Sequence, residues 1–201
     1  TAIDAVLDVS RRIDESQGLR DELAARFRFL NAEKKLVLVT GHRRENFGAG
    51  FDGICRALLE LAQRSDIEIV YPVHLNPKVR EPVTQILGES KNIHLIDPQE
   101  YDTFIYLMKC AHLILTDSGG IQEEAPYLDV PVLVTRDVTE RPEGVDAGTL
   151  RLVGTETQKI IDNLQEILYN KDIYNKMSKS VNPYGDGNSS NKIVELLRRL
   201  I

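Results

Sequence analysis

Three polar segments of this sequence have residue types that could do chemistry, and the first spans residues 40–50. It contains His42, whose imidazole can titrate near neutral pH, together with two arginines and the carboxylate of Glu45. Its glycines allow a tight loop and a close approach of the backbone to a ligand. Their spacing is not that of a dinucleotide-binding fingerprint. The segment therefore predicts a functional loop, with a polar surface loop whose arginines pair with Glu45 as the alternative.

The second segment, residues 116–126, has the residue types of a phosphate site. Ser118, Gly119 and Gly120 come directly before a stretch with helical character. A glycine-rich step into a helix supplies free backbone N–H groups and the positive end of the helix dipole, both of which attract phosphate. Glu124 lies one turn inside the helix, where its carboxylate could accept hydrogen bonds from a ribose diol. In the alternative interpretation Ser118 only caps the helix and the glycines only make a bend.

Charged residues dominate the third segment, residues 135–143, which includes Arg136. A solvated run of charge is the ordinary explanation for such a composition. Each of the three segments, however, follows an apolar run that suits a parallel strand, and the carboxyl ends of parallel strands meet at one edge of the sheet. The three segments together therefore predict a binding site at that edge. His74 follows another such run and could face the same place, although a lone histidine is more often structural. His94 and His112 are expected to be structural.

The elements that must position these segments alternate between short apolar runs and helical patterns. Continuous apolar runs of this kind are typical of parallel strands that are covered on both faces. The alternation predicts an α/β fold with a doubly wound parallel sheet and right-handed crossovers. The expected strands cover residues 36–40, 67–73, 93–96, 113–116, 132–135 and 150–153. The expected helices lie near residues 50–64, 78–88, 100–110, 120–128 and 157–169.

The two ends of the chain differ from this alternating middle. Residues 1–30 have a helical pattern, with Leu19 and Leu23 among apolar residues at spacings of three or four. Either these terminal helices cover the core of this domain, or one of them packs against a partner domain. The chain starts without a methionine, which we interpret as the sign of a fragment. A turn cluster at residues 182–187 leads into a last amphipathic helix, whose apolar face carries Ile193, Leu196, Leu197 and Leu200.

Composition and charge disfavour several classes of protein. The 201 residues suffice for one large domain or two small ones, and a single domain of this size needs no disulfide or metal for stability. Cys55 and Cys110 are far apart and belong to no metal-binding motif, which argues against a disulfide framework and a zinc site and fits a reducing cytoplasm. A net charge of −6 disfavours a nucleic-acid surface. The sequence has neither a long apolar run nor a leader, so no membrane or secretion is expected.

Five motifs of this sequence resemble those of one enzyme family. In order along the chain they read GHRREN, PVHLNP, TDSGGIQEEAP, RDVTERPE and NPYGDG. The non-hydrolysing UDP-N-acetylglucosamine (UDP-GlcNAc) 2-epimerases carry similar motifs in the same order. The resemblance covers roughly residues 35–200, which is nearly the whole chain. It implies the second half of an enzyme of the GT-B glycosyltransferase type, which has two Rossmann-like domains and an active site in the cleft between them.

The resemblance also implies roles for individual residues in nucleotide binding. Phe104 is expected to stack on uracil, and Glu124 is expected to take the ribose hydroxyls. Arg136 is expected among the residues that bind the substrate. The diphosphate is expected to contact Ser118, Gly119 and Gly120.

Catalytic and regulatory roles are implied in the same way. His42 matches the family's active-site histidine, and we expect Glu45 beside it to take part in catalysis. Arg43 and His74 match positions at which bacterial members bind a second UDP-GlcNAc as an activator. The family reaction inverts C2 of the sugar without a metal or redox cofactor. UDP is eliminated to give 2-acetamidoglucal, and it is added back after the opposite face has been protonated.

On this resemblance we divide the chain into three parts. Residues 1–34 form a helical segment that joins to an absent first domain, residues 35–181 a Rossmann-like nucleotide-binding domain, and residues 182–201 a turn and a C-terminal helix. The family's essential carboxylates belong to the first domain. We therefore expect the chain to bind UDP and UDP-GlcNAc but to turn over poorly alone, since each missing acid–base group costs about 10² to 10⁴ in rate.

The intact enzyme is expected to be a cytoplasmic homodimer. Two alternatives remain open at this stage. The chain could be half of a GT-B glycosyltransferase, although the HRREN and RDVTERPE motifs favour the epimerase. It could also be a standalone nucleotide-sugar binding module, which an assay for UDP-ManNAc formation would distinguish from an intact enzyme.

Overall fold

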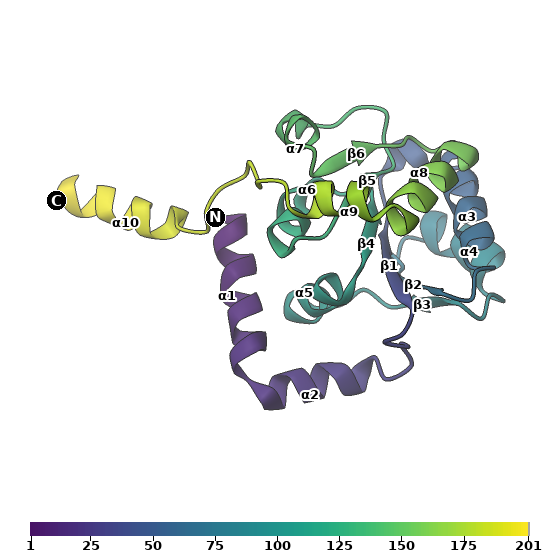
Figure 1. The fold of residues 1–201 in the computed structure, drawn as a ribbon, viewed down its shortest axis with the longest axis horizontal. Coiled ribbons are helices and arrows are strands. Elements are labelled where there is room, and N and C mark those ends of the chain that lie inside the picture. Colours follow the sequence, from purple (N-terminus) through teal and green to yellow (C-terminus); the bar gives the residue numbers. More distant parts are fainter. Residues whose placement is uncertain (201) are drawn as a thin grey trace.

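Six parallel strands form a sheet in the order β3-β2-β1-β4-β5-β6 (Figure 1). The computed structural model describes residues 1–200. Each strand lies within one residue of its expected bounds, which confirms the doubly wound α/β fold. The strands are β1 (Lys35–Thr40), β2 (Ile67–Pro72), β3 (Ile93–Ile96), β4 (Leu113–Thr116), β5 (Val132–Val134) and β6 (Leu150–Leu152).

Helices cover both faces of this sheet (Figure 1). They are α1 (Ala2–Glu15), α2 (Gln17–Arg26), α3 (Ala49–Leu61), α4 (Pro77–Leu87), α5 (Tyr101–Cys110), α6 (Gly119–Glu124), α7 (Pro142–Ala147), α8 (Thr157–Tyr169), α9 (Lys171–Ser178) and α10 (Ser189–Leu200). Two 3-10 turns, η1 (Arg44–Asn46) and η2 (Ala125–Leu128), lie in the connections. The five helices expected within the alternating middle are confirmed. The short helices α7 and α9 lie outside the expected ranges, because 6 and 8 residues are too short a stretch to identify a helix from its pattern.

Two hydrophobic clusters hold these layers together. Val37 and Val39 of β1 belong to the cluster that contains the inward faces of α3, α4 and α8. Leu36 and Leu38 belong to the other cluster, with α1, α2 and α5. The split follows from strand geometry, because successive side chains point to opposite faces of a sheet. Both faces are therefore covered, as the continuous apolar strands predict.

The N-terminal helices pack on this domain's own core. Ile3, Val6, Val9 and Ile13 of α1 are buried, and most of them share the cluster that covers β1 and α5. The helical pattern of residues 1–30 divides into two helices at Ser16, whose hydroxyl accepts a hydrogen bond from the Leu19 N–H at 3.3 Å. For the N-terminal end of the chain, this confirms the alternative in which the terminal helices cover the core of this domain.

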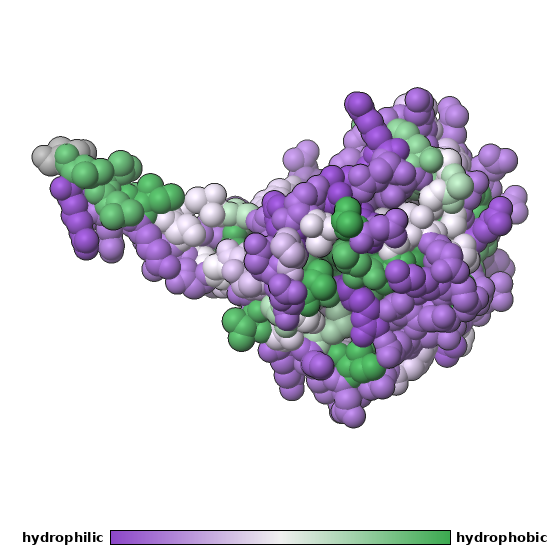
Figure 2. Space-filling view, turned by 90° about the horizontal axis from the view of Figure 1, so that it is seen from above, coloured by the Kyte–Doolittle hydropathy of each residue, from purple (hydrophilic) through white to green (hydrophobic). Residues whose placement is uncertain are grey.

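The C-terminal helix α10 behaves differently, because it extends from the body as an arm (Figure 1). None of its described side chains is buried, and Leu196 and Leu200 are 60% and 82% exposed. Figure 2 shows apolar side chains gathered along one side of this arm. None of the helices within residues 1–200 is both long and apolar enough to cross a membrane.

A contact with α1 fixes the start of the arm. The carboxylate of Asp4 accepts hydrogen bonds from the backbone N–H groups of Ser189 at 3.2 Å and Ser190 at 2.7 Å. The bond from Ser190 lowers the pKa of Asp4 to about 2. Gly187 takes a positive φ of 73° just before the helix, against Leu7 of α1. The arm therefore leaves the body in a direction that α1 determines.

The exposed apolar face of α10 predicts self-association of the chain. Replacing Leu196 and Leu197 together by Ser should lower the tendency to dimerise, because it removes the centre of this face while keeping Asp4 as the cap. Sedimentation velocity measures the change. The matched control is the double substitution Glu195→Ser and Arg199→Ser on the same helix, which leaves the net charge unaltered and should leave association unaltered. A parent chain that stays monomeric at high concentration would contradict this prediction.

Candidate functional site

The three polar segments meet at the carboxyl edge of the sheet. We name them loop 1 (residues 40–50, after β1), loop 2 (residues 116–126, after β4 and including α6) and loop 3 (residues 135–143, after β5). β1 and β4 are neighbours in the sheet, although β2 and β3 lie between them in the sequence. The strand order therefore reverses between loops 1 and 2, which is the place where open parallel sheets bind ligands.

Asp117 connects loop 2 to loop 1. Its side chain is fully buried, and its Oδ2 atom accepts hydrogen bonds from the backbone N–H groups of His42 at 3.0 Å and Arg43 at 2.8 Å. The side-chain amide of Asn46 donates to the same oxygen at 3.2 Å and to the carbonyl of Thr135 in loop 3 at 3.3 Å. One buried carboxylate and one buried amide thus bring all three loops together.

Gly41 leaves little room for a side chain at this point. A Cβ atom on Gly41 would lie 3.2 Å from the Tyr71 hydroxyl and 3.5 Å from Asp117 Oδ2. A side-chain hydrogen bond also joins the ends of β1 and β4, where the hydroxyls of Thr40 and Thr116 lie 2.6 Å apart. The start of loop 1 is therefore seated tightly against the end of β4.

The first residues of loop 2 lead into α6 as the sequence predicts, but Ser118 does not act as a side-chain cap. It occupies the N-cap position without a capping hydrogen bond from its hydroxyl. A Cβ atom on Gly119 would have the Arg43 guanidinium, at 3.6 Å, as its nearest neighbour. Gly120 is exposed. Because they are the first residues of α6, Gly119 and Gly120 have backbone N–H groups with no partner inside the helix, which is the property that a phosphate requires.

Ion pairs join loop 3 to loop 1. Arg136, which is only 7% exposed, donates from Nε to Glu45 at 2.6 Å and also pairs with Glu140. Arg43 donates to the other oxygen of Glu140 at 3.1 Å and to the carbonyl of Asp117 at 3.1 Å. The hydrogen bond from Arg136 lowers the pKa of Glu140 to about 2. The partner of Glu45 is therefore an arginine of loop 3, and the alternative in which it pairs with arginines of its own segment is wrong.

The four histidines lie in two different places. The rings of His42 and His74 are stacked, with centroids 5.3 Å apart, so His74 does face this edge. The Nδ1 atom of His42 lies 3.8 Å from Asp117 Oδ1. By contrast, His94 bonds to Glu68 at 3.0 Å and His112 stacks on Tyr174 at 4.2 Å, and neither lies in the three loops.

Glu124 faces α5 across the same edge. Its carboxylate accepts a hydrogen bond from the Tyr101 hydroxyl at 3.3 Å. Burial raises the pKa of Glu124 and raises the pKa of Tyr101 to about 12. Phe104 lies one turn further along α5, partly buried against the core cluster that covers this face. Phe104 and Glu124, the residues expected to contact uracil and ribose, thus belong to two adjoining helices, α5 and α6.

Several residues of this network were not singled out in the sequence. Asp117 and Asn46 were passed over because nothing in a sequence marks which polar residue is buried. Among residues 1–200, no group of three His, Cys, Asp or Glu side chains comes together in a way that could hold a metal ion. In the sequence, the spacing of four residues between Arg136 and Glu140 is a signal that could have indicated their ion pair. A further ion pair, between Arg141 and Glu123, links loop 3 to α6.

The sequence of the chain matches one known protein family over nearly its whole length. The family model described as UDP-N-acetylglucosamine 2-epimerase matches residues 1–198. The chain belongs to this family. The UDP-N-acetylglucosamine 2-epimerase of Escherichia coli (strain K12) is 58% identical over 199 residues. That match covers 98% of this chain and 53% of the relative, so the chain spans about half the length of the curated relatives it matches.

Solved structures of family members have the same fold. The structure of the Neisseria meningitidis enzyme bound to UDP-GlcNAc aligns with a TM-score of 0.94 at 47% identity, over 98% of this chain and 53% of that one. The Methanocaldococcus jannaschii enzyme in complex with UDP-GlcNAc and UDP aligns with a TM-score of 0.83 at 32% identity, again over 98% and 53%. The C-terminal domain of a group 1 glycosyl transferase from Francisella tularensis, 18% identical with a TM-score of 0.55, shares the fold.

The role of Asp117 can be tested by Asp117→Asn. The amide nitrogen cannot accept hydrogen bonds, so donors of loop 1 lose a partner, either the buried amide of Asn46 or the partly buried N–H groups of His42 and Arg43. We expect a loss of about 1–3 kcal/mol in the free energy of unfolding for each such donor. Urea denaturation measures it. Asp97→Asn, at an exposed ion pair with Arg80, is the matched control and should cost little. Equal effects of the two substitutions would contradict the role given to Asp117.

Proposed function

We propose that this chain is the UDP-binding, C-terminal half of an enzyme that interconverts UDP-GlcNAc and UDP-ManNAc. The observation that carries the proposal is the meeting of loops 1, 2 and 3 around Asp117, at the reversal of strand order, in a chain of the epimerase family. Relatives named as this enzyme, and solved relatives described with UDP-GlcNAc and UDP, support the same substrate class.

The diphosphate is proposed to bind at the start of α6. The N–H groups of Gly119 and Gly120 and the uncommitted hydroxyl of Ser118 are the donors there. The half-buried carboxylate of Glu124 accepts the ribose hydroxyls, in exchange for its bond with Tyr101. Phe104 on the neighbouring helix stacks on uracil. These contacts place the nucleotide along the edge formed by α5 and α6.

The arginines contribute mainly through the charge network. Arg136 is nearly buried and holds two carboxylates, so it contacts a substrate only if Glu45 or Glu140 gives way. We propose that it fixes Glu45 and Glu140 beside the leaving diphosphate. Arg43, together with His74, is proposed to bind a second UDP-GlcNAc as an activator. The stacking of His74 on His42 supports communication between that position and the reacting sugar.

The proposed reaction starts with removal of the C2 proton of the sugar and cleavage of its bond to UDP. The product, 2-acetamidoglucal, is then protonated at C2 from the opposite face, and UDP is added back at C1. Such a route needs acid–base groups near C2 and donors for the leaving diphosphate. His42, whose side chain is 51% exposed, and Glu45 are proposed among the former, and loop 2 provides the latter.

The remaining groups are proposed to come from the other half of the enzyme. We propose that residues 1–34 join to it, that the apolar face of α10 packs on it, and that the complete enzyme is a homodimer. Two free cysteines fit a cytoplasmic location, and the net charge of −6 disfavours a nucleic-acid partner. Without the other half, turnover should be close to nil, and this sets the proposal apart from a chain that is catalytically complete.

Calorimetric titration of the chain with UDP tests the nucleotide site. We expect saturable binding, and we expect Glu124→Ala to weaken it at least about tenfold while binding of inorganic pyrophosphate stays the same, because the lost contacts are with the ribose. Lowering the pH should also weaken UDP binding of the parent, since protonation of Glu124, whose pKa is raised by burial, removes the carboxylate charge. Glu60→Ala, on the exposed side of α3, is the control. No heat with UDP at millimolar concentration would count against the site.

His42 is expected to matter for turnover more than for nucleotide affinity. In a protein that carries both halves, His42→Asn should lower the epimerisation rate about 10²-fold or more, because an acid–base group is lost, and should leave the UDP affinity nearly unchanged. The rate is followed by NMR detection of UDP-ManNAc. His112→Asn, at the opposite edge of the sheet, should leave the rate intact. A near-normal rate for His42→Asn would leave His42 with a structural role only.

A further inference from the structure

One motif of the sequence, NPYGDG at residues 182–187, has no part in the nucleotide contacts proposed above. It nevertheless touches both loop 3 and α6. The Tyr184 hydroxyl accepts a hydrogen bond from the N–H of Gly144 at 2.9 Å and donates one to the carbonyl of Arg141 at 3.2 Å. The amide of Asn182 donates to the carbonyl of Glu123 at 3.1 Å. A short segment near the C-terminus therefore braces two parts of the site.

The two residues that make these contacts, Asn182 and Tyr184, form a brace whose parts are bonded to each other. The side-chain oxygen of Asn182 accepts a hydrogen bond from the Tyr184 N–H at 2.9 Å, which fixes the two contacts relative to one another. The absence of a side chain at Gly144 leaves room for the Tyr184 hydroxyl. A Cβ atom there would lie 2.5 Å from the Tyr184 oxygen and 2.4 Å from Leu150 Cδ1. Burial raises the pKa of Tyr184, so the hydroxyl keeps its proton and can donate to Arg141 at neutral pH.

The atoms that Tyr184 holds belong to the join between loop 3 and α6. Arg141 forms an ion pair with Glu123, the neighbour of Glu124. Its N–H donates to the Thr139 hydroxyl at 3.1 Å, and that hydroxyl donates to Gln122 of α6 at 2.5 Å. If residues 141–144 shift, the contacts that set loop 3 against α6 shift with them.

We propose that Tyr184 is a positioning residue for the nucleotide site, a proposal that rests on the function proposed above. It acts through Arg141 and Gly144 and itself touches no substrate. Its hydroxyl fixes the end of loop 3 against the start of α7, and Asn182 fixes the end of α6 to the same segment. The site is thereby held in the geometry that binds UDP before the ligand arrives.

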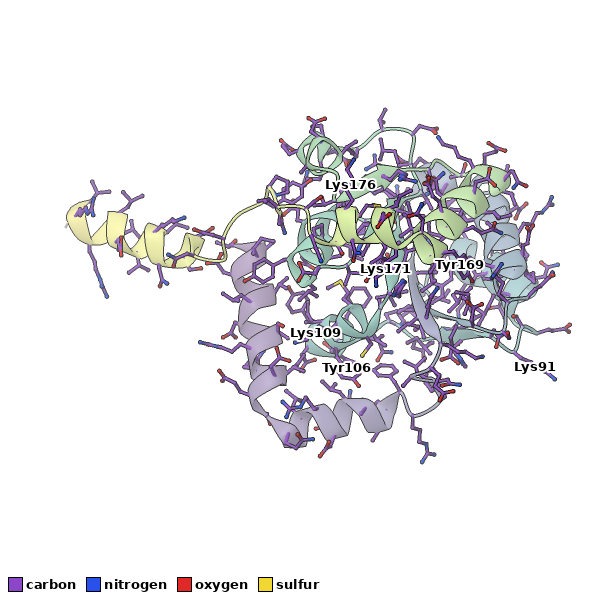
Figure 3. The ribbon with its side chains drawn as sticks, viewed as in Figure 1. Lys91, Tyr106, Lys109, Tyr169, Lys171 and Lys176 are labelled. Carbon is purple, nitrogen blue, oxygen red and sulfur yellow. The ribbon has the colours of Figure 1, made fainter. Side chains whose placement is uncertain are left out.

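The test compares Tyr184→Phe with Tyr169→Phe. Both remove one hydroxyl that forms hydrogen bonds, since Tyr169 donates to Asp66 at 2.9 Å. Tyr169 lies at the end of α8, where Figure 3 labels it, outside the three loops. We expect Tyr184→Phe to weaken UDP binding by the chain about tenfold in calorimetry. We also expect it to speed hydrogen exchange in residues 136–149, whereas Tyr169→Phe does neither.

Asn182→Ala provides a second variant in case Tyr184→Phe does not fold. It removes the bond to Glu123 and keeps the aromatic ring, and it too should weaken UDP binding. Equal UDP affinity and equal exchange in all variants would overturn the proposal. If the parent chain does not bind UDP, the proposed function fails instead. In that case hydrogen exchange of residues 136–149 tests the brace separately. Faster hydrogen exchange in Tyr184→Phe but not in Tyr169→Phe supports the brace, and unchanged hydrogen exchange overturns it.

Discussion

The arrangement of loops in this domain depends on the hydrogen bonding of one buried carboxylate. Asp117 comes directly after β4 and has no exposed surface, and a buried charge is stable only when hydrogen bonds satisfy it. Its donors are two backbone N–H groups and a side-chain amide from loop 1. Loop 1 therefore has to fold across the end of the neighbouring strand, which brings His42 and Arg43 to the edge where α6 begins. The same amide of Asn46 then holds the start of loop 3.

Charge within the assembled loops is nearly balanced. Arg43 and Arg136 are matched by Glu45 and Glu140, so loops 1 and 3 bring little net positive charge to a diphosphate. On the proposed function, anion binding in this chain therefore relies on the backbone donors at the start of α6. We expect the other half of the enzyme to supply further positive charge. On the same proposal, the nucleotide binds on this side, and the chemistry is completed only when the other half is present.

Much of the fold could be predicted from the sequence, because it depends on local pattern. The six apolar runs and the helical periods between them fix a doubly wound sheet. The segments after β1, β4 and β5 also meet at one edge of the sheet, as the sequence predicts. Two features could not be predicted, since they depend on distant parts of the chain. One is the choice of Arg136 as the partner of Glu45, which lies 91 positions away. The other is the direction of α10, which Asp4 sets from the far end of the chain.

A crystal structure of the chain with UDP tests the central claim most directly. The claim is that loops held together by Asp117 form a nucleotide diphosphate site without help from another domain. The account predicts density for the diphosphate at the N–H groups of Gly119 and Gly120 and for the ribose at Glu124, with the bonds from loop 1 to Asp117 unchanged. Nucleotide bound elsewhere on the chain, or bound at this edge only after loop 1 has left Asp117, would contradict it.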